Sequence, residues 1–217
     1  MQPTSWLHSQ TNNIPNTRVE FLYESKEDWA ENKLGLESDN ICAYTDGSAN
    51  ELGVGADVSV ESTIEDQEQS VSLSKTTTIF QAEMLALSTA LTILNSCVNT
   101  SIALITDSMS AMQSLQNPAV RTKTKLSCIN QINSVAQSNQ LALIWVPGHS
   151  GIHGNKKADE MANIGAALET VGPDPAPPIS LRYIKGKICE WSAEEFHNKW
   201  SNSAKASTIK ETLNLNI

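Results

Sequence analysis

The order of apolar segments between residues 41 and 168 constrains the fold more than any other feature of this chain. Three short segments with strand-like alternation come first, and two further strand patterns follow, separated by stretches with the three- and four-residue spacing of amphipathic helices. The resulting order, βββαβαβα, is typical of an α/β domain. The predicted strands are 41–46, 53–60, 71–73, 102–105 and 141–146, and the predicted helices are 80–94, 109–115, 123–138 and 155–168.

This order also predicts how the strands pair. Consecutive strands joined by short turns form an antiparallel meander, whereas strands separated by helices pair in parallel. We therefore expect a five-stranded mixed sheet, with three antiparallel strands followed by parallel ones, flanked by helices. In sheets of this kind, functional side chains collect at the carboxyl ends of the strands.

The domain is expected to occupy residues 40–169, with a further segment on each side. Residues 1–39 are polar, contain two prolines and show only a weak helical pattern, so we interpret them as an N-terminal extension. Residues 170–217 begin with a proline-rich linker, which cannot continue a helix, and go on to a helical tail. The tail helix, expected at 184–200, is amphipathic, and the sequence allows it to pack on the domain or to belong to a larger assembly.

The four cysteines bear on the cellular compartment. They are far apart, include no Cys-x-x-Cys pair and lie mostly in apolar runs, which is the pattern of reduced core residues rather than of disulfides or a zinc site. The chain does not open with a basic start and an apolar stretch, and no segment approaches the roughly 20 apolar residues of a membrane span. We therefore expect an intracellular protein, cytoplasmic or nuclear, without a membrane partner.

The net charge of −9 argues by itself against a nucleic-acid partner, because phosphate binding depends on Lys and Arg. The charge is unevenly distributed, however: residues 1–109 carry −12 and residues 110–217 carry +3. Basic residues gather at 121–125, 156–157 and 182–187, where two interpretations stay open, a contact with a phosphate backbone or ordinary solvated surface.

Four acidic residues lie at positions where this fold gathers functional groups. Converging carboxylates repel one another and are tolerated when a divalent cation neutralises them, and hard Mg²⁺ or Mn²⁺ prefers oxygen ligands. Two such ions can position an attacking water and a leaving oxygen at a phosphodiester. The pattern therefore indicates nuclease chemistry. Asp46 and Asp107 end strands, Glu83 lies near the start of a helix, and Asp159 lies in the first turn of the last helix.

Each of these residues also has a structural interpretation. An Asp before a Gly is commonly a turn residue, which fits Asp46. Asp107 can cap the helix that follows it, and Asp159 can interact favourably with a helix dipole. Glu83 can belong to a solvated helix face, although its neighbours are apolar. Taken singly, none of the four residues decides between structure and chemistry.

The four residues occur in motifs whose order and context resemble the type 1 ribonuclease H family. The resemblance covers about residues 41–168, and its last two motifs are long and nearly gapless. Within that family, the chain looks most like the ribonuclease H domains that follow reverse transcriptases in non-LTR retrotransposons, through DSMSA at 107–111 and GHSGIHGN at 148–155. The motifs are YTDGS at 44–48, QAEMLAL at 81–87, ITDS at 105–108, WVPGHSG at 145–151 and NKKADEMA at 155–162.

The resemblance implies roles for individual residues. His149 matches a mobile histidine that assists proton transfer or product release. Independently of the family, an imidazole titrates near neutral pH, and a glycine on each side of the pair 149–150 lets the loop move. The metal-binding and catalytic carboxylates match Asp46, Glu83, Asp107 and Asp159, and the substrate contacts match Thr78, Ser108 and Asn155.

The resemblance further implies a ribonuclease H-like fold and an endonuclease that hydrolyses the RNA strand of RNA–DNA hybrids. Its cofactor would be two Mg²⁺ ions, with Mn²⁺ as a substitute, and a reverse transcriptase domain in a larger polyprotein would be a partner. One alternative is a catalytically weak or inactive ribonuclease H-like module that binds nucleic acid or a partner protein; the complete carboxylate set counts against it. Another is an integrase-like or resolvase-like DNA nuclease, against which the spacing from the loop at 148–149 to Asp159 counts.

Overall fold

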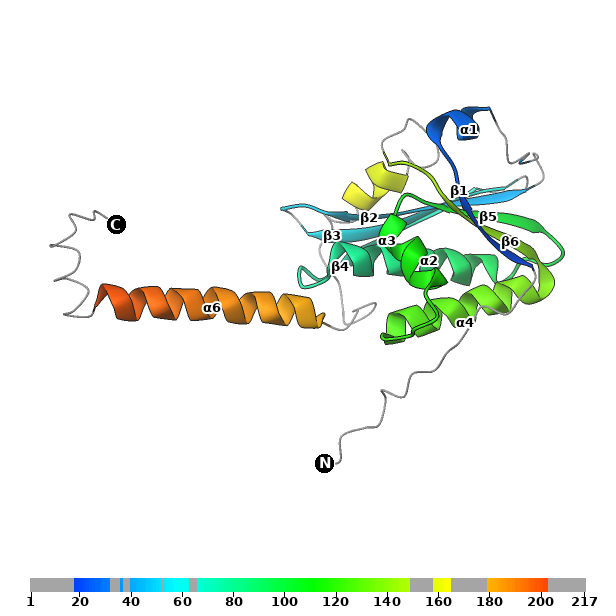
Figure 1. The fold of residues 1–217 in the computed structure, drawn as a ribbon. Helices are drawn as coiled ribbons and strands as arrows, with labels where there is room; N and C mark the ends of the chain where they lie inside the picture. The colour runs from blue at the N-terminus through cyan, green and yellow to red at the C-terminus, as the bar shows by residue number, and fades with distance from the viewer. Residues whose placement is uncertain are drawn as a thin grey trace. The chain divides into compact units, whose positions relative to one another are not determined.

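The computed structural model describes residues 18–31, 36, 40–51, 53–62, 66–148, 158–164 and 179–202. The chain divides into two compact units, Met1–Pro177 and Pro178–Ile217. In the first unit, a sheet carries helices on both of its faces (Figure 1).

The sheet confirms the predicted mixed topology. β2 (Ile41–Ala49), β3 (Val54–Glu61) and β4 (Gln67–Leu73) form an antiparallel meander. β5 (Ser101–Thr106) pairs in parallel with β2, and β6 (Gln140–Trp145) pairs in parallel with β5. The spatial order, β1-β6-β5-β2-β3-β4, places β5 and β2 at the centre of the sheet.

The sheet has six strands, where the sequence predicted five. The additional strand, β1 (Val19–Tyr23), pairs in parallel with β6 at one edge and comes from the segment interpreted as an extension. Val19 and Phe21 are only partly buried against the core. A half-exposed strand of five residues gives too few positions to show a period of two, which is why the sequence pattern did not reveal it. A short helix, α1 (Lys26–Ala30), follows β1.

The apolar faces of two long helices form the main core with the sheet. α2 (Ile79–Leu94) and α4 (Lys123–Ser138) cover the same face of the sheet in Figure 1. The spacing that predicted α2 places Met84 and Leu87 in this core, where both are fully buried. Burial of one such side chain contributes roughly 1.5–3 kcal/mol. α3 (Met109–Gln116) lies between β5 and α4 in the chain.

The opposite face of the sheet carries a smaller core. Tyr44 and Ile144 pack there with Ala158 of the helical segment 158–164. This segment, yellow in Figure 1, is the described part of the helix predicted at 155–168. Trp29 of α1 contacts Tyr44 edge-on, with ring centroids 6.5 Å apart. The segment 158–164 is therefore attached to the sheet face opposite α2.

The second unit contains α6 (Leu181–Ser201), where the sequence predicted a helix at 184–200. Ser180 caps its start, because the Ser180 Oγ accepts a hydrogen bond from the backbone N–H of Tyr183 at 3.1 Å. None of the residues of α6 is buried. A search of the described helices finds none with the length and apolar character that a membrane span requires.

Candidate active site

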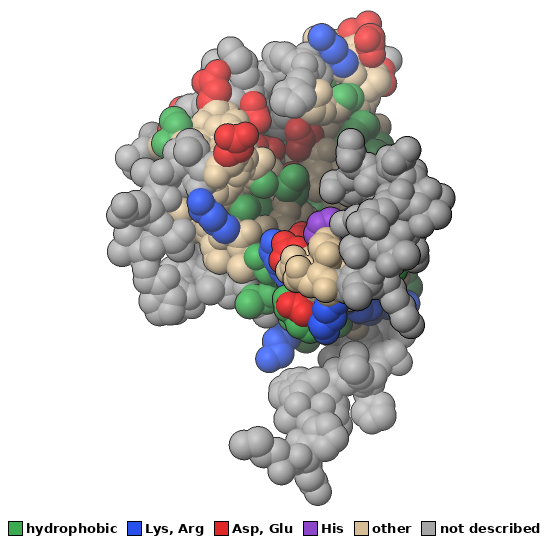
Figure 2. All heavy atoms as spheres, turned by 90° about the vertical axis from the view of Figure 1, so that its left-hand side faces the viewer, with side chains coloured by type: hydrophobic (Ala, Val, Ile, Leu, Met, Phe, Trp, Pro, Cys, Tyr) green, Lys and Arg blue, Asp and Glu red, His purple; other side chains and the backbone are tan. Residues whose placement is uncertain are grey.

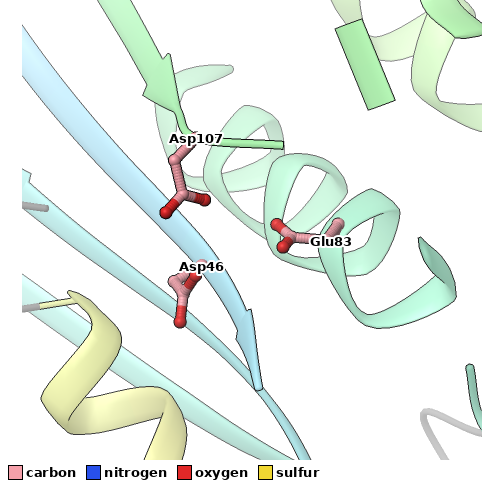
Figure 3. Close-up of side chains that lie close together, drawn as sticks. All are labelled: Asp46, Glu83 and Asp107. Atoms are coloured by element: carbon pink, nitrogen blue, oxygen red, sulfur yellow. The ribbon is translucent and has the colours of Figure 1, made fainter. Parts of the chain in front are cut away.

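Three acidic side chains from three elements converge beside the centre of the sheet. Asp46 lies on β2, Asp107 directly follows β5, and Glu83 lies in α2, and their carboxylates point toward one another in Figure 3. One carboxylate oxygen of each residue lies within 4.8 Å of the corresponding oxygens of the other two. The structure thus brings together three of the four carboxylates that the sequence predicted as one site.

Strand pairing accounts for the meeting of Asp46 and Asp107. The parallel pairing of β2 with β5 ends at Thr45 and Thr106, and the two aspartates are the next residues along each strand. Asp46 was predicted to end its strand, but β2 continues to Ala49 because it still pairs with β3. The carboxyl ends of the two central parallel strands therefore deliver two carboxylates to one place.

Gly47 lets β2 approach the start of α2 closely enough for Glu83 to reach Asp46. A Cβ atom at Gly47 would lie 2.6 Å from the backbone nitrogen of Glu83 and 3.0 Å from the carbonyl carbon of Ala82. Real Cβ atoms do not approach backbone so closely, so only glycine fits between this strand and this helix. The Asp-Gly pair is thus required by helix packing rather than by a turn.

The start of α2 is fixed by a capping box. The Oγ1 of Thr78 accepts from the backbone N–H of Gln81 at 3.3 Å, while the backbone N–H of Thr78 donates to the Gln81 side chain at 3.1 Å. This reciprocal pair satisfies free N–H groups of the first turn. Thr78 was predicted to contact substrate; in this structure its hydroxyl also donates to Gln81 at 3.0 Å, so its observed role is to begin the helix that carries Glu83.

Hydrogen bonds fix the backbone at Asp107 and at the residue that follows it. The indole Nε1 of Trp145 donates to the carbonyl oxygen of Asp107 at 2.9 Å. Ser108, a predicted substrate contact, caps α3 through its Oγ, which accepts from the backbone N–H of Ala111 at 3.4 Å. A Cβ atom at Gly148 would lie 2.7 Å from Oδ2 of Asp107, so the loop backbone passes directly over this carboxylate.

Burial and mutual repulsion disfavour the ionised carboxylates. Asp46 and Glu83 have exposed fractions of only 7% and 6%. Burial, followed by the charges of Asp107 and Asp159, raises the pKa of Asp46 to about 7, although a hydrogen bond from the Gly47 backbone opposes the shift. Burial, followed by the charges of Asp46 and Asp107, raises the pKa of Glu83 to about 9. Without a cation, the site therefore retains protons near neutral pH.

The residues present fit a divalent cation. Oε2 of Glu83 is buried and has no hydrogen-bond partner within the described part of the protein. A buried carboxylate oxygen without a partner costs free energy, and a hard cation would satisfy it. Asp46, Glu83 and Asp107 would hold such an ion, because each offers an oxygen to the same small volume.

Asp159 lies close to this group but is not one of its three members. It belongs to the helical segment 158–164, is half-buried, and acts on Asp46 strongly enough for its charge to raise the pKa of that residue. In Figure 3 the yellow helical segment runs beside Asp46. His149 and Asn155, the other two predicted site residues, lie outside the residues that the structure describes.

Asp57, near the site, was not singled out by the sequence, and Gly148 has a further role. Asp57 on β3 pairs directly with Asp46 across the antiparallel ladder, is completely buried and adds to the rise in the pKa of Asp46. A charged residue inside the apolar run GVGADVSV at 53–60 was the signal that could have indicated it. Gly148 was expected to let the loop move, and the structure shows that its backbone also covers the Asp107 carboxylate.

One of the predicted basic clusters offers fewer exposed cations than its sequence suggested. In Figure 2, Lys and Arg side chains and Asp and Glu side chains both occur among the residues drawn in colour. In the predicted basic cluster 121–125, Lys125 is buried, and its Nζ donates to the carbonyl oxygens of Asn117 and Ala119. Lys125 is thus a structural residue, so the cluster 121–125 has one cation fewer to contact a phosphate backbone.

The fold and the carboxylate group together define a class of protein, an α/β domain whose acidic side chains at the ends of its central parallel strands could hold a divalent cation. A family model described as RNase H matches residues 38–167, which is more than half of the chain. The chain belongs to the ribonuclease H family. Membership supports a nuclease acting on RNA–DNA hybrids, in a family that generally uses divalent metal ions.

Proposed function

We propose that this chain is an endonuclease that hydrolyses the RNA strand of RNA–DNA hybrids with two Mg²⁺ ions, which Mn²⁺ can replace. The observation that carries the proposal is the approach of one carboxylate oxygen each of Asp46, Glu83 and Asp107 to within 4.8 Å of one another, although burial and repulsion raise the pKa values of Asp46 and Glu83. Such an approach is favourable in the ionised state when a cation is bound. Asp159 would complete the set from the other side of Asp46.

Divalent cations held by these carboxylates would supply the Lewis acid that activates water and stabilises the leaving oxygen. The residues of the chain have separate tasks. Asp46 links the two sides of the carboxylate set, because its carboxyl group responds to the charges of both Asp107 and Asp159. Glu83 from α2 and Asp107 from the end of β5 provide the carboxylates on the side of Asp46 away from Asp159. His149, on the loop after Gly148, would transfer a proton or assist product release.

We propose a cellular context for this chain on the basis of its sequence motifs, not of its site geometry. The strings DSMSA and GHSGIHGN resemble those of domains that accompany a reverse transcriptase in non-LTR retrotransposons. A reverse transcriptase domain that holds the hybrid would add phosphate contacts to those of this domain, where Lys125 of the cluster 121–125 is buried. The four free cysteines fit an intracellular protein in the cytoplasm or nucleus.

The proposal is tested by cleavage of end-labelled RNA–DNA hybrid in Mg²⁺, with RNA duplex and DNA duplex of the same sequence in parallel reactions. We expect the wild-type chain to cut only the RNA strand of the hybrid, leaving a 3′-hydroxyl and a 5′-phosphate. Asp46→Asn and Asp107→Asn should abolish cleavage while circular dichroism stays that of the wild type. Each substitution keeps the size of the side chain and removes a charged oxygen ligand.

A matched control is Glu20→Gln, which removes a carboxylate from the exposed side of β1 and should leave cleavage unchanged. Equal cleavage by wild type and Asp107→Asn would refute the proposal. Binding of the hybrid by a wild-type chain that does not cut it in either Mg²⁺ or Mn²⁺ would instead support the inactive, binding module.

A further inference from the structure

The fully buried side chains of the segment 158–164, which carries Asp159, are small. Ala158 and Ala162 are its fully buried residues, and both have small side chains. Ile164, its largest aliphatic residue, is 51% exposed. Burial of two methyl groups contributes far less than burial of the Leu and Met side chains of α2. Met161 is partly buried as well, and polar contacts add to what fixes this segment against the sheet.

One polar contact ties the segment to the strand that carries Asp46. The Oγ of Ser48 donates to the side-chain oxygen of Asn163 at 2.7 Å. Ser48 lies two residues beyond Asp46 and therefore on the same side of β2. The contact joins positions 115 residues apart in the chain, so no local chain connection holds them together.

The other end of the Asn163 amide points to Asp159. Its Nδ2 donates to the backbone carbonyl oxygen of Asp159 at 2.8 Å and lies 3.5 Å from the carboxylate oxygen Oδ1. The amide thus accepts from β2 with its oxygen and donates toward Asp159 with its nitrogen, so that a single side chain bridges the strand and the acidic residue.

We propose that Ser48 and Asn163 are positioning residues that set where the Asp159 carboxylate stands relative to Asp46. This inference rests on the proposed function. Asp46 and Asp159 reach the site from opposite ends of the domain sequence, and their charges already interact. A shift of the segment 158–164 moves one carboxylate of the set while leaving Asp46, Glu83 and Asp107 in place. Loss of the bridge therefore weakens cation binding on the Asp159 side without removing a ligand.

The chain offers a closely matched control for this bridge. Ser134 of α4 donates through its Oγ to the side-chain oxygen of Asn95, also at 2.7 Å and also on the surface. This second Ser–Asn pair joins α4 to the end of α2 and includes none of the four acidic residues. Ser134→Ala therefore removes the same chemical contact at a place where only the stability of the fold can respond.

The experiment measures Mn²⁺ binding without substrate, by titration with electron paramagnetic resonance detection, together with the Mg²⁺ concentration for half-maximal cleavage. A neutral hydrogen bond contributes on the order of 1 kcal/mol, which corresponds to roughly a fivefold change in an equilibrium. We expect Ser48→Ala and Asn163→Ala each to weaken Mn²⁺ binding about three- to tenfold. The double variant should be no weaker than the worse single variant, because both lose one bridge.

Ser48→Thr keeps the hydroxyl donor and should restore the affinity for Mn²⁺, and Ser134→Ala should bind Mn²⁺ as the wild type does. The KM for the hybrid should stay within about twofold of the wild-type value in all five variants, because none of the changes removes a substrate contact assigned above. If Ser48→Ala binds Mn²⁺ like Ser134→Ala, the positioning role is wrong while the proposed function stands. If the wild type itself binds no Mn²⁺, the proposed function and this inference both fail.

Discussion

Replacement of Glu83 by Gln should stabilise the metal-free protein at pH 8 while abolishing cleavage. The pKa of Glu83 rises from 4.5 to about 9, through burial and the charges of Asp46 and Asp107. Each pKa unit corresponds to about 1.4 kcal/mol, so retention of this proton at pH 8 reduces stability by at most about 5 kcal/mol. Local rearrangement lowers this value, and we expect a stabilisation on the order of 2 kcal/mol for the uncharged Gln.

The stability of the wild type should fall as the pH rises, because of the raised pKa of Glu83. Below pH 4.5 the Glu83 carboxyl is protonated in both states and has no pH-dependent effect. As the pH rises toward 9, the unfolded chain releases this proton and the native protein retains it, so the free energy of unfolding of the wild type falls. Urea denaturation in EDTA, followed by circular dichroism between pH 5 and pH 9, should therefore show a steeper loss of stability for the wild type than for Glu83→Gln.

The addition of Mg²⁺ should reverse the difference. A cation that binds only the native protein stabilises it by mass action, and the wild type keeps all its ligands. Glu20→Gln, which removes an exposed carboxylate on β1, should follow the wild type at every pH. A Glu83→Gln protein that is less stable than the wild type in EDTA at pH 8 would refute the electrostatic account of this site.

Three other substitutions test the packing around the site, and a fourth, in α6, is a control for the first. Gly47→Ala places a Cβ 2.6 Å from the backbone of α2 and should destabilise the protein by about 1–3 kcal/mol, with loss of cleavage. The Cβ of Gly186→Ala meets nothing within 4 Å, so this substitution should instead stabilise α6 by about 0.5–1 kcal/mol. Urea denaturation measures both changes. Gly148→Ala meets only the Asp107 side chain at 2.7 Å, so cleavage should fall at least tenfold while the urea midpoint barely changes. Thr78→Ala removes the cap of α2 and should lower the free energy of unfolding by about 1 kcal/mol, and an unchanged midpoint would contradict the capping role.

The strands and long helices of the domain could be predicted because their apolar residues repeat over many positions. α2 was expected at 80–94 and spans Ile79–Leu94, and the strand expected at 102–105 is β5. β1 was missed because its five half-exposed residues carry no distinct period, and its pairing with β6 depends on contacts more than a hundred residues apart. Periodicity reports the elements that bury a whole face and misses an edge strand.

The carboxylates of the site could be predicted from where each stands on its element, and three of them meet as expected. Their spacing could not be read from the sequence, because it depends on how closely β2 approaches α2 at Gly47 and on how the loop at Gly148 covers Asp107. The same limit applies to Ser48 and Asn163, which are ordinary surface residues in the sequence and become a bridge only when the sheet and the last helix are placed together.

The construction of the site opposes the stability of the metal-free fold. The capped start of α2 and the close approach of β2 at Gly47 place Glu83 near Asp46. Burial and repulsion raise the pKa values of both carboxyl groups in this position. A domain selected only for stability would place an apolar side chain at Glu83, among the buried neighbours Ala82 and Met84. A divalent cation resolves the conflict, because it removes the repulsion and satisfies the unpartnered Glu83 oxygen. Stabilisation by Mg²⁺ and cleavage should consequently rise and fall together across substitutions in this site.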